Sequence, residues 1–208
     1  GNKQAEWRTD PARAGIGGCL GDIGTHAFQL AEHVSGLRTE AVCAELTTHV
    51  PGRLLDDDVS ALLRFEGGSR GVLKASQVAA GEENGLKLRV HGELGGLEWS
   101  QVEPNTLTLR WLDRPAETVR TGGPGLAPLT LALTRTPAGH PEGYLEAFAN
   151  IYSAFAAAVR RGGCASDIAP GMKGWFPGLA DGLPTMRFVE AVATNAAANE
   201  KWTAIESG

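Results

Sequence analysis

The sequence is poor in cysteine and has no long apolar run, and both absences exclude classes of protein. Its three cysteines, Cys19, Cys43 and Cys164, stand far apart and form no C-x-x-C pair. An odd number of isolated cysteines excludes a disulfide framework and a zinc ribbon, and it suits a reducing compartment, so we expect a cytoplasmic protein. No stretch approaches the ~20 apolar residues of a membrane helix, so we expect no membrane association.

Positive charge is also scarce. The 208 residues carry 19 Lys and Arg against 24 Asp and Glu, which gives a net charge of −5. Because binding to phosphate backbones needs a clustered basic surface, we expect no nucleic-acid partner. With 42% apolar and 21% charged residues the composition is that of a globular protein, and we expect residues 1–208 to form one domain. The chain opens at Gly1 instead of Met and has no charged-then-apolar leader, so we expect a processed chain or a piece of a longer one.

Short extended segments fill the middle of the chain, and helical patterns flank them. Residues 15–21 are mostly glycine, and apolar residues then recur at helical spacing over 22–34, with Gly36 as the stop. The extended patterns predict one mainly antiparallel sheet of about six strands or more, and the linker at 67–70 predicts a hairpin. After a long connection at 122–139, helices are expected over 141–161 and from about 181 or 184 to 199. The fold class predicted is α+β, an open antiparallel sheet with helices packed on one face. The expected strands are 41–50, 58–66, 71–78, 86–90, 97–101, 106–112 and 117–121.

Asp22 and His26 form the best candidate for catalytic chemistry. Their i, i+4 spacing places both side chains on one face of a helix. A carboxylate beside an imidazole orients the ring and favours its protonated form, which suits a general acid/base near neutral pH. The preceding glycines allow a ligand or another backbone to come close. The alternative is structural: Asp22 caps the helix and His26 packs in the core.

Two other kinds of site have weaker support. Asp22, His26, Glu32 and His33 could be assembled into a metal-ligand list, but no H-E-x-x-H pattern is present, and we predict no metal site. A dinucleotide fingerprint after Gly15 and Gly17 would need a glycine at position 20, which is a leucine, and no strand precedes it. The sequence therefore predicts no dinucleotide-binding unit of its own.

Several polar positions outside this motif have a structural and a functional interpretation. His140 precedes a predicted helix, where it caps the helix or contacts a ligand. Arg8 is either a solvated charge or a contact to an anion or hydroxyl. The acidic run at 56–58 is interpreted as a turn with solvated carboxylates, because calcium loops need a longer ligand pattern. Cys19 has no His or Asn pattern that would mark it as a nucleophile.

The segment 17–26 (GGCLGDIGTH) resembles the G-G-x-x-x-D-x-G-x-H signature of the Gfo/Idh/MocA oxidoreductases, the glucose–fructose oxidoreductase and inositol dehydrogenase group. Trp7-Arg8 and Asp10-Pro11 resemble the stretch that leads into the signature. Residues 139–148 (GHPEGYLEAF) resemble a subgroup of sugar-type dehydrogenases, and residues 181–192 resemble the terminal helix of the family. Ile16 is a departure, because relatives often have a third glycine there. The resemblance spans nearly the whole chain.

The resemblance implies the second half of a two-domain enzyme. A Rossmann domain that this chain lacks would bind NAD or NADP, and this half would supply the substrate side of the cleft, with no certain cofactor-binding residue. By resemblance, His26 matches the catalytic acid/base and Asp22 matches its acidic partner at the substrate hydroxyl. Arg8 and His140 are expected to contact a sugar or polyol. The lysine of the family's E-K-P motif has no counterpart here, so we expect the fragment alone to be inactive.

Three readings of the whole protein stay open. The first is an NAD(P)-dependent dehydrogenase of a sugar or polyol. The second is an NAD-dependent, redox-neutral glycoside hydrolase of the same superfamily. The third is a non-catalytic dimerisation module. In every case we expect a homodimer or homotetramer formed through the sheet, in which Leu86, Leu88 and Val90 share one strand face.

Overall fold

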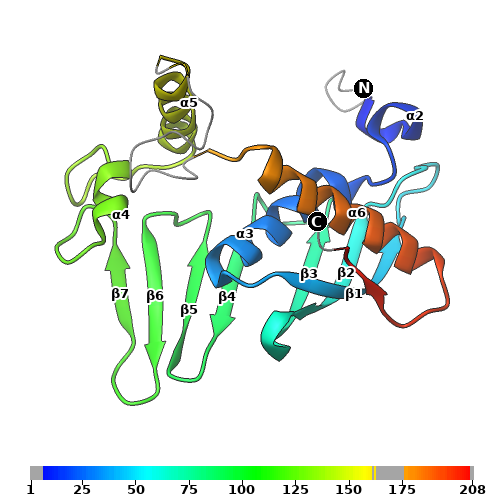
Figure 1. Cartoon of the computed structure of the whole chain (residues 1–208), viewed down its shortest axis with the longest axis horizontal. Helices are drawn as coiled ribbons and strands as arrows, with labels where there is room; N and C mark the ends of the chain where they lie inside the picture. The colour runs from blue at the N-terminus through cyan, green and yellow to red at the C-terminus, as the bar shows by residue number, and fades with distance from the viewer. Residues whose placement is uncertain (1–6, 161, 163–175, 207–208) are drawn as a thin grey trace. The chain divides into compact units, whose positions relative to one another are not determined.

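The computed structural model describes residues 7–160, 162 and 176–206, and the chain forms two compact units (Figure 1). The first unit comprises Gly1–Glu83 and Asp181–Gly208, and the second comprises Asn84–Ala180. The second unit is thus inserted into the sequence of the first. Cys164 and the predicted helix stop at Gly163 lie outside the described residues.

The first unit is built on a four-stranded antiparallel sheet with the order β3-β2-β1-β8. Its strands are β1 (Thr39–Thr47), β2 (Asp58–Phe65), β3 (Arg70–Ser76) and β8 (Thr203–Ala204). Alternate residues of β2, from Val59 to Phe65, are buried, because successive side chains of a strand point to opposite faces. The hairpin between β2 and β3 turns through η3 (Glu66–Gly68), where Gly67 and Gly68 have φ of 68° and 87°. The predicted hairpin is confirmed.

Two helices cover the buried face of this sheet, α3 (Thr25–Ser35) and α6 (Leu179–Ala197) (Figure 1). Phe28 of α3 and Phe188 of α6 are almost fully buried, and their rings stack with centroids 4.0 Å apart. Removing a side chain of this kind from water stabilises the fold by about 1.5–3 kcal/mol. Gly36 ends α3 in the left-handed conformation at φ 71°, as the sequence predicts.

Short helical segments precede α3. These are η1 (Trp7–Thr9), α2 (Pro11–Ala14) and a π-helical turn, η2 (Leu20–Gly24), which continues directly into α3. Asp10 caps α2 by accepting the Ala12 N–H at 3.0 Å, and Pro11 occupies the first helical position. The sequence predicted an irregular segment here, since a helix of four residues has no periodicity to detect.

The second unit holds another four-stranded antiparallel sheet, in the order β4-β5-β6-β7. Its elements are β4 (Lys87–His91), β5 (Gly95–Ser100), β6 (Thr106–Trp111), β7 (Glu117–Arg120), α4 (Pro128–Leu133) and α5 (Tyr144–Arg160). On one sheet face Glu98 pairs with Arg89 and Arg110, and these guanidinium groups lower the pKa of the Glu98 carboxyl. The opposite face is apolar, and no residue of the four strands is fully buried.

The predicted class, α+β with antiparallel strands and helices on a sheet face, is confirmed, but the described strands are divided between two sheets. Between β3 and β4 the chain forms a turn, where the Glu82 N–H donates to the Ala79 carbonyl and Gly81 has φ 91°. The long helix begins at Tyr144 and not at Pro141. Its start is fixed by the Gly143 N–H, which donates to the Glu146 carboxylate at 2.9 Å in a capping-box arrangement.

None of the helices in the described part of the chain combines the length and the apolar character that a bilayer crossing needs.

Candidate active site

The signature segment folds into a π-helical turn at the start of α3. The Thr25 N–H donates to the Leu20 carbonyl, the i→i+5 bond that defines this geometry. Such π turns inside α-helices are frequent at functional sites. The widened turn contains Asp22, whereas His26 lies in the following α-helix. Their spacing therefore spans two kinds of helix, which the periodicity of the sequence does not reveal.

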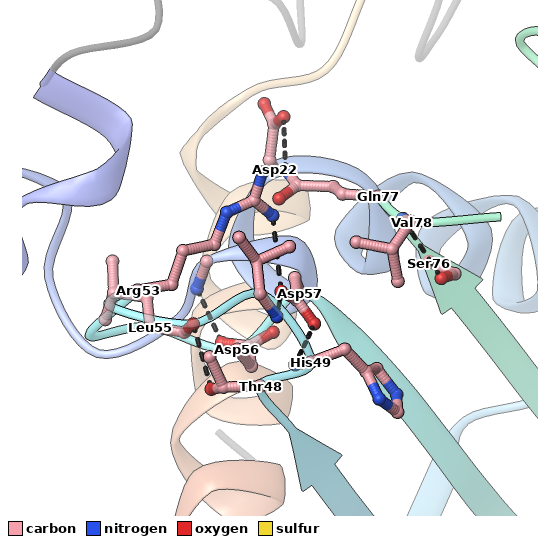
Figure 2. A network of polar contacts seen from close by, with 12 residues as sticks. Asp22, Thr48, His49, Arg53, Leu55, Asp56, Asp57, Ser76, Gln77 and Val78 are labelled. Carbon is pink, nitrogen blue, oxygen red and sulfur yellow. Dashed lines mark hydrogen bonds and ion pairs between the residues drawn. The ribbon is translucent and has the colours of Figure 1, made fainter. Parts of the chain in front are cut away.

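Asp56 holds the beginning of this turn from a distant loop (Figure 2). Its carboxylate accepts the Gly18 N–H at 2.6 Å and the Leu20 N–H at 2.7 Å, and its carbonyl accepts the Cys19 N–H at 2.9 Å. The first N–H groups of a helix lack partners within the helix, and here one residue satisfies three in succession. A Cβ on Gly18 would collide with the Asp56 carbonyl oxygen. Gly18 is therefore needed for close approach of another backbone, as expected of this glycine-rich segment.

Asp57 fixes the loop that carries Asp56 (Figure 2). Its fully buried carboxylate accepts the backbone N–H groups of His49 at 2.8 Å and Val50 at 3.0 Å, and it contacts the Arg53 guanidinium at 3.4 Å. These contacts, the His49 N–H first, hold the pKa of the Asp57 carboxyl below its usual value. The interpretation of this acidic run as solvated carboxylates is wrong for Asp56 and Asp57, since neither exposes more than 8% of its surface.

Asp22 stands at a pocket of about 190 Å³ in the first unit. Its carboxylate accepts a hydrogen bond from the Gln77 amide at 3.1 Å and pairs with the Arg8 guanidinium at 3.7 Å. The Asp22 side chain is 31% exposed, so a ligand can reach it. The residues that line the pocket are Arg8, Thr9, Gly18, Asp22, Arg53, Leu55, Asp56 and Gln77.

The structure brings together two of the four predicted site residues, Arg8 and Asp22. His26 lies on the first turn of α3 with an exposed side chain, and within the described residues no hydrogen bond is formed by its imidazole. His140 belongs to the second unit, where its exposed ring lies 3.2 Å from the Pro137 carbonyl through Nδ1. It precedes α5 by four positions and does not cap that helix.

Sequence reasoning missed Gln77, Asp56 and Asp57. Gln77 follows the end of β3 and carries no motif, so only the pairing of strands brings it to Asp22. The acidic run was visible, but three adjacent carboxylates before a strand resemble an ordinary surface turn. Their burial depends on the backbone N–H groups of segment 18–20, which lies far away in the sequence.

Cys19 lies beside the site in an environment that disfavours the reactive thiolate. It is fully buried, and burial together with the nearby Asp56 carboxylate raises the pKa of its thiol to about 12. A thiol must ionise to act as a nucleophile or metal ligand. Glu32, part of the alternative metal-ligand list, binds the Thr39 N–H at 2.7 Å and Arg38 at 3.2 Å. Across residues 7–160, 162 and 176–206, no three His, Cys, Asp or Glu side chains are grouped to hold a metal ion.

Comparison with known proteins identifies the family. Residues 1–98 match the model of the GFO/IDH/MocA C-terminal domain. The uncharacterized oxidoreductase YfiI of Bacillus subtilis is 33% identical over 156 residues, which cover 74% of this chain and 40% of that protein. The levoglucosan dehydrogenase of Pseudarthrobacter phenanthrenivorans is 29% identical over 161 residues, covering 62% and 41%.

Solved structures agree with this match over nearly the whole chain. An inositol dehydrogenase homolog from Azotobacter vinelandii, complexed with NAD+, is 34% identical with a TM-score of 0.88, covering 98% of this chain and 52% of its own. An Azotobacter vinelandii inositol dehydrogenase homolog complexed with NADH and myo-inositol is 31% identical with a TM-score of 0.85, covering 97% of this chain and 52% of its own. A levoglucosan dehydrogenase complex with NADH and levoglucosan is 27% identical, with a TM-score of 0.79 and coverage of 98% and 54%. The chain thus spans about half the length of each of these solved relatives. It spans 40% and 41% of the length of the two curated relatives.

These matches show a class of protein, the oxidoreductases. The chain belongs to the Gfo/Idh/MocA family and corresponds to its C-terminal domain. The resemblance of segment 17–26 to the family signature predicted this assignment, which is confirmed.

Proposed function

We propose that this chain supplies the substrate side of an NAD(P)-dependent oxidoreductase that acts on a sugar or polyol hydroxyl. The observation that carries the proposal is the pocket at Asp22, where a partly exposed carboxylate lies beside the donors of Arg8 and Gln77. Such a mixture of acceptor and donors suits a hydroxyl group, which both donates and accepts hydrogen bonds. Relatives complexed with NADH and with myo-inositol or levoglucosan support this substrate class.

In the proposed mechanism, the Asp22 carboxylate accepts a hydrogen bond from a substrate hydroxyl and so orients the carbon that reacts. The Arg8 guanidinium, 52% exposed, donates to a neighbouring oxygen. The His26 imidazole takes the hydroxyl proton as general base, and within the described residues no hydrogen bond occupies its basic ring nitrogen. His140 is proposed as a further substrate contact.

The described residues do not fit the task of holding the nucleotide. Their paired strands are all antiparallel, and no glycine-rich turn links a strand to a helix as a dinucleotide pyrophosphate site requires. We therefore propose that NAD or NADP is held mainly by a Rossmann domain outside these 208 residues, so that this chain alone is inactive. A bound nicotinamide supplies the hydride acceptor; the residues of this chain orient substrate and move the proton.

The test is nicotinamide absorbance with the whole protein, the chain joined to the nucleotide-binding domain of its gene product. NAD and NADP are each offered with a panel of polyols and sugars. Replacing His26 by Ala should lower kcat by about 10²–10⁴ in the active combination. His33→Ala is the matched control, because His33 is exposed on the same helix but lies about two turns beyond His26, further from Asp22. An unchanged rate for His26→Ala would remove His26 from this role.

The same assay separates the alternatives. Cleavage of a glycosidic bond without net formation of NADH would identify the redox-neutral glycoside hydrolase. A folded protein that neither reduces a nucleotide nor cleaves a glycoside would contradict both catalytic assignments.

We further propose that the second sheet mediates self-association. Its apolar face, Leu88, Val90, Leu97, Trp99, Leu107 and Leu109, is only half-buried within the chain. A contiguous apolar sheet face that its own chain covers only in part is the kind of surface that marks an interaction site. Light scattering after size-exclusion chromatography should find a dimer or tetramer that Leu88→Lys dissociates, whereas Thr118→Lys, at an exposed position of β7, should leave it intact. A monomeric wild-type protein at high concentration would contradict this proposal.

A further inference from the structure

We propose that Gln77 is a positioning residue: its amide holds one oxygen of the Asp22 carboxylate, so that the other oxygen is left to accept a ligand hydroxyl. This proposal rests on the role of Asp22 in the proposed function. Gln77 is not part of the signature segment, and it reaches Asp22 from the end of β3 (Figure 2).

Both donors at Asp22 converge on the same oxygen. The Gln77 Nε2 donates to Asp22 Oδ2 at 3.1 Å, and the Arg8 Nη1 lies 3.7 Å from the same atom. In the part of the chain that the structure describes, no donor is bonded to Asp22 Oδ1. A carboxylate oxygen can accept two hydrogen bonds, so Oδ1 keeps its full capacity for a hydroxyl.

Gln77 is the better placed of the two donors to set this orientation. Its contact with the Asp22 carboxylate is a hydrogen bond of normal length, whereas the Arg8 guanidinium lies beyond that length. A primary amide donates along a defined direction and adds no charge to the pocket. Arg8 therefore remains available to a ligand while Gln77 holds the carboxylate.

The contact joins two segments that the same loop fixes. The Gln77 N–H donates to the Asp57 carbonyl at 2.8 Å, and the Asp56 carboxylate binds the N–H groups of Gly18 and Leu20 at the start of the π turn. Because Asp56 and Asp57 are adjacent and buried, the backbone at Gln77 and the turn that carries Asp22 are anchored to the same loop. Orientation to within a few tenths of an ångström is what a positioned acceptor needs.

The kinetic test uses two replacements of similar length in the whole protein. Gln77→Met removes the donor and should lower kcat/KM by about 5- to 20-fold, because a hydrogen bond to a charged group is lost. Gln77→Glu keeps the shape but places a like charge against Asp22, and its loss should be larger. Gln101→Met makes the same chemical change at a glutamine that follows β5, outside the pocket, and should keep the wild-type rate.

The Asp22→Ala background separates positioning from a structural role. If Gln77 acts through Asp22, then Gln77→Met should lower kcat/KM no further when Asp22 is already replaced. If the same loss appears in both backgrounds, or if Gln77→Met retains the wild-type kcat/KM, the proposal is overturned.

A second measurement is independent of activity. In a double-mutant cycle on the unfolding of this chain, Gln77→Met and Asp22→Ala should couple by about threefold or more in the equilibrium constant. If the whole protein reduces neither nucleotide with any substrate, the proposed function fails. The double-mutant cycle then decides alone whether Gln77 orients Asp22. Coupling then supports Gln77 as the residue that orients Asp22, and additivity overturns it.

Discussion

Replacing Asp56 by Ala should destabilise the first unit far more than a typical loop substitution. The change removes both carboxylate acceptors of the Gly18 and Leu20 N–H groups, at 2.6 and 2.7 Å, in a residue that exposes only 8% of its surface. A hydrogen bond to a charged group contributes about 1.5–3 kcal/mol. Two such bonds predict a loss of about 3–6 kcal/mol in the free energy of unfolding, because the N–H groups are left without partners.

Urea denaturation followed by circular dichroism measures this loss, and thermal unfolding should show a fall in Tm of roughly 6–24 °C for a protein of this size. Asp56→Asn keeps one acceptor oxygen and should lose about half as much. Glu45→Ala, at an exposed position of β1, is the control and should change stability by no more than about 0.5 kcal/mol. If Asp56→Ala also costs less than about 1 kcal/mol, the carboxylate does not hold the π turn, and the reasoning from these contacts is refuted.

The remaining predictions concern pH and thiol chemistry. The pKa of Asp57 is lowered, chiefly by the His49 N–H, so its contribution to stability is present above the unfolded-state pKa near 3.9 and is lost as pH falls through the folded value. The Tm difference between wild type and Asp57→Asn should therefore shrink below about pH 4, and a constant difference from pH 7 to pH 3 would contradict this assignment. The Cys19 thiol, buried and with its pKa raised to about 12, should resist alkylation at pH 8 until the chain unfolds. Mass spectrometry of the Cys19 peptide measures this, and rapid labelling of the native protein would be the opposite result.

Local sequence signals predicted the elements whose causes are local. The hairpin between β2 and β3 depends on adjacent glycines, and the end of α3 depends on Gly36, and both were predictable. The start of α5 was misplaced by three residues, because Pro141 matched the rule for a first helical residue while the Glu146 carboxylate caps at Gly143. α4 lies inside the predicted connection, since six residues are too few to show a helical period.

Of the candidate site, only the residues in and just before the signature motif were predictable from the sequence. Asp22 and His26 stand in a recognisable pattern, and Arg8 was assigned from the stretch before it. The contact between Arg8 and Asp22 agrees with that assignment. The position of Gln77 beside Asp22 depends on the register of β2 with β3. The burial of Asp56 depends on a segment 36 to 38 residues away in the sequence. Interactions over such separations leave no periodicity in a single sequence.

The insertion of the second unit into the first has a consequence for synthesis on the ribosome. Phe188 and Val192 complete the core around Phe28, and β8 pairs with β1, yet both segments follow the 97 residues of the insertion. At about 5–20 residues per second, the nascent chain waits several seconds with the apolar faces of α3 and β2 uncovered. The second unit can fold during that wait. A message truncated before the codon for Phe188 would release a product whose first core cannot close, and such a product is a substrate for chaperones and proteases.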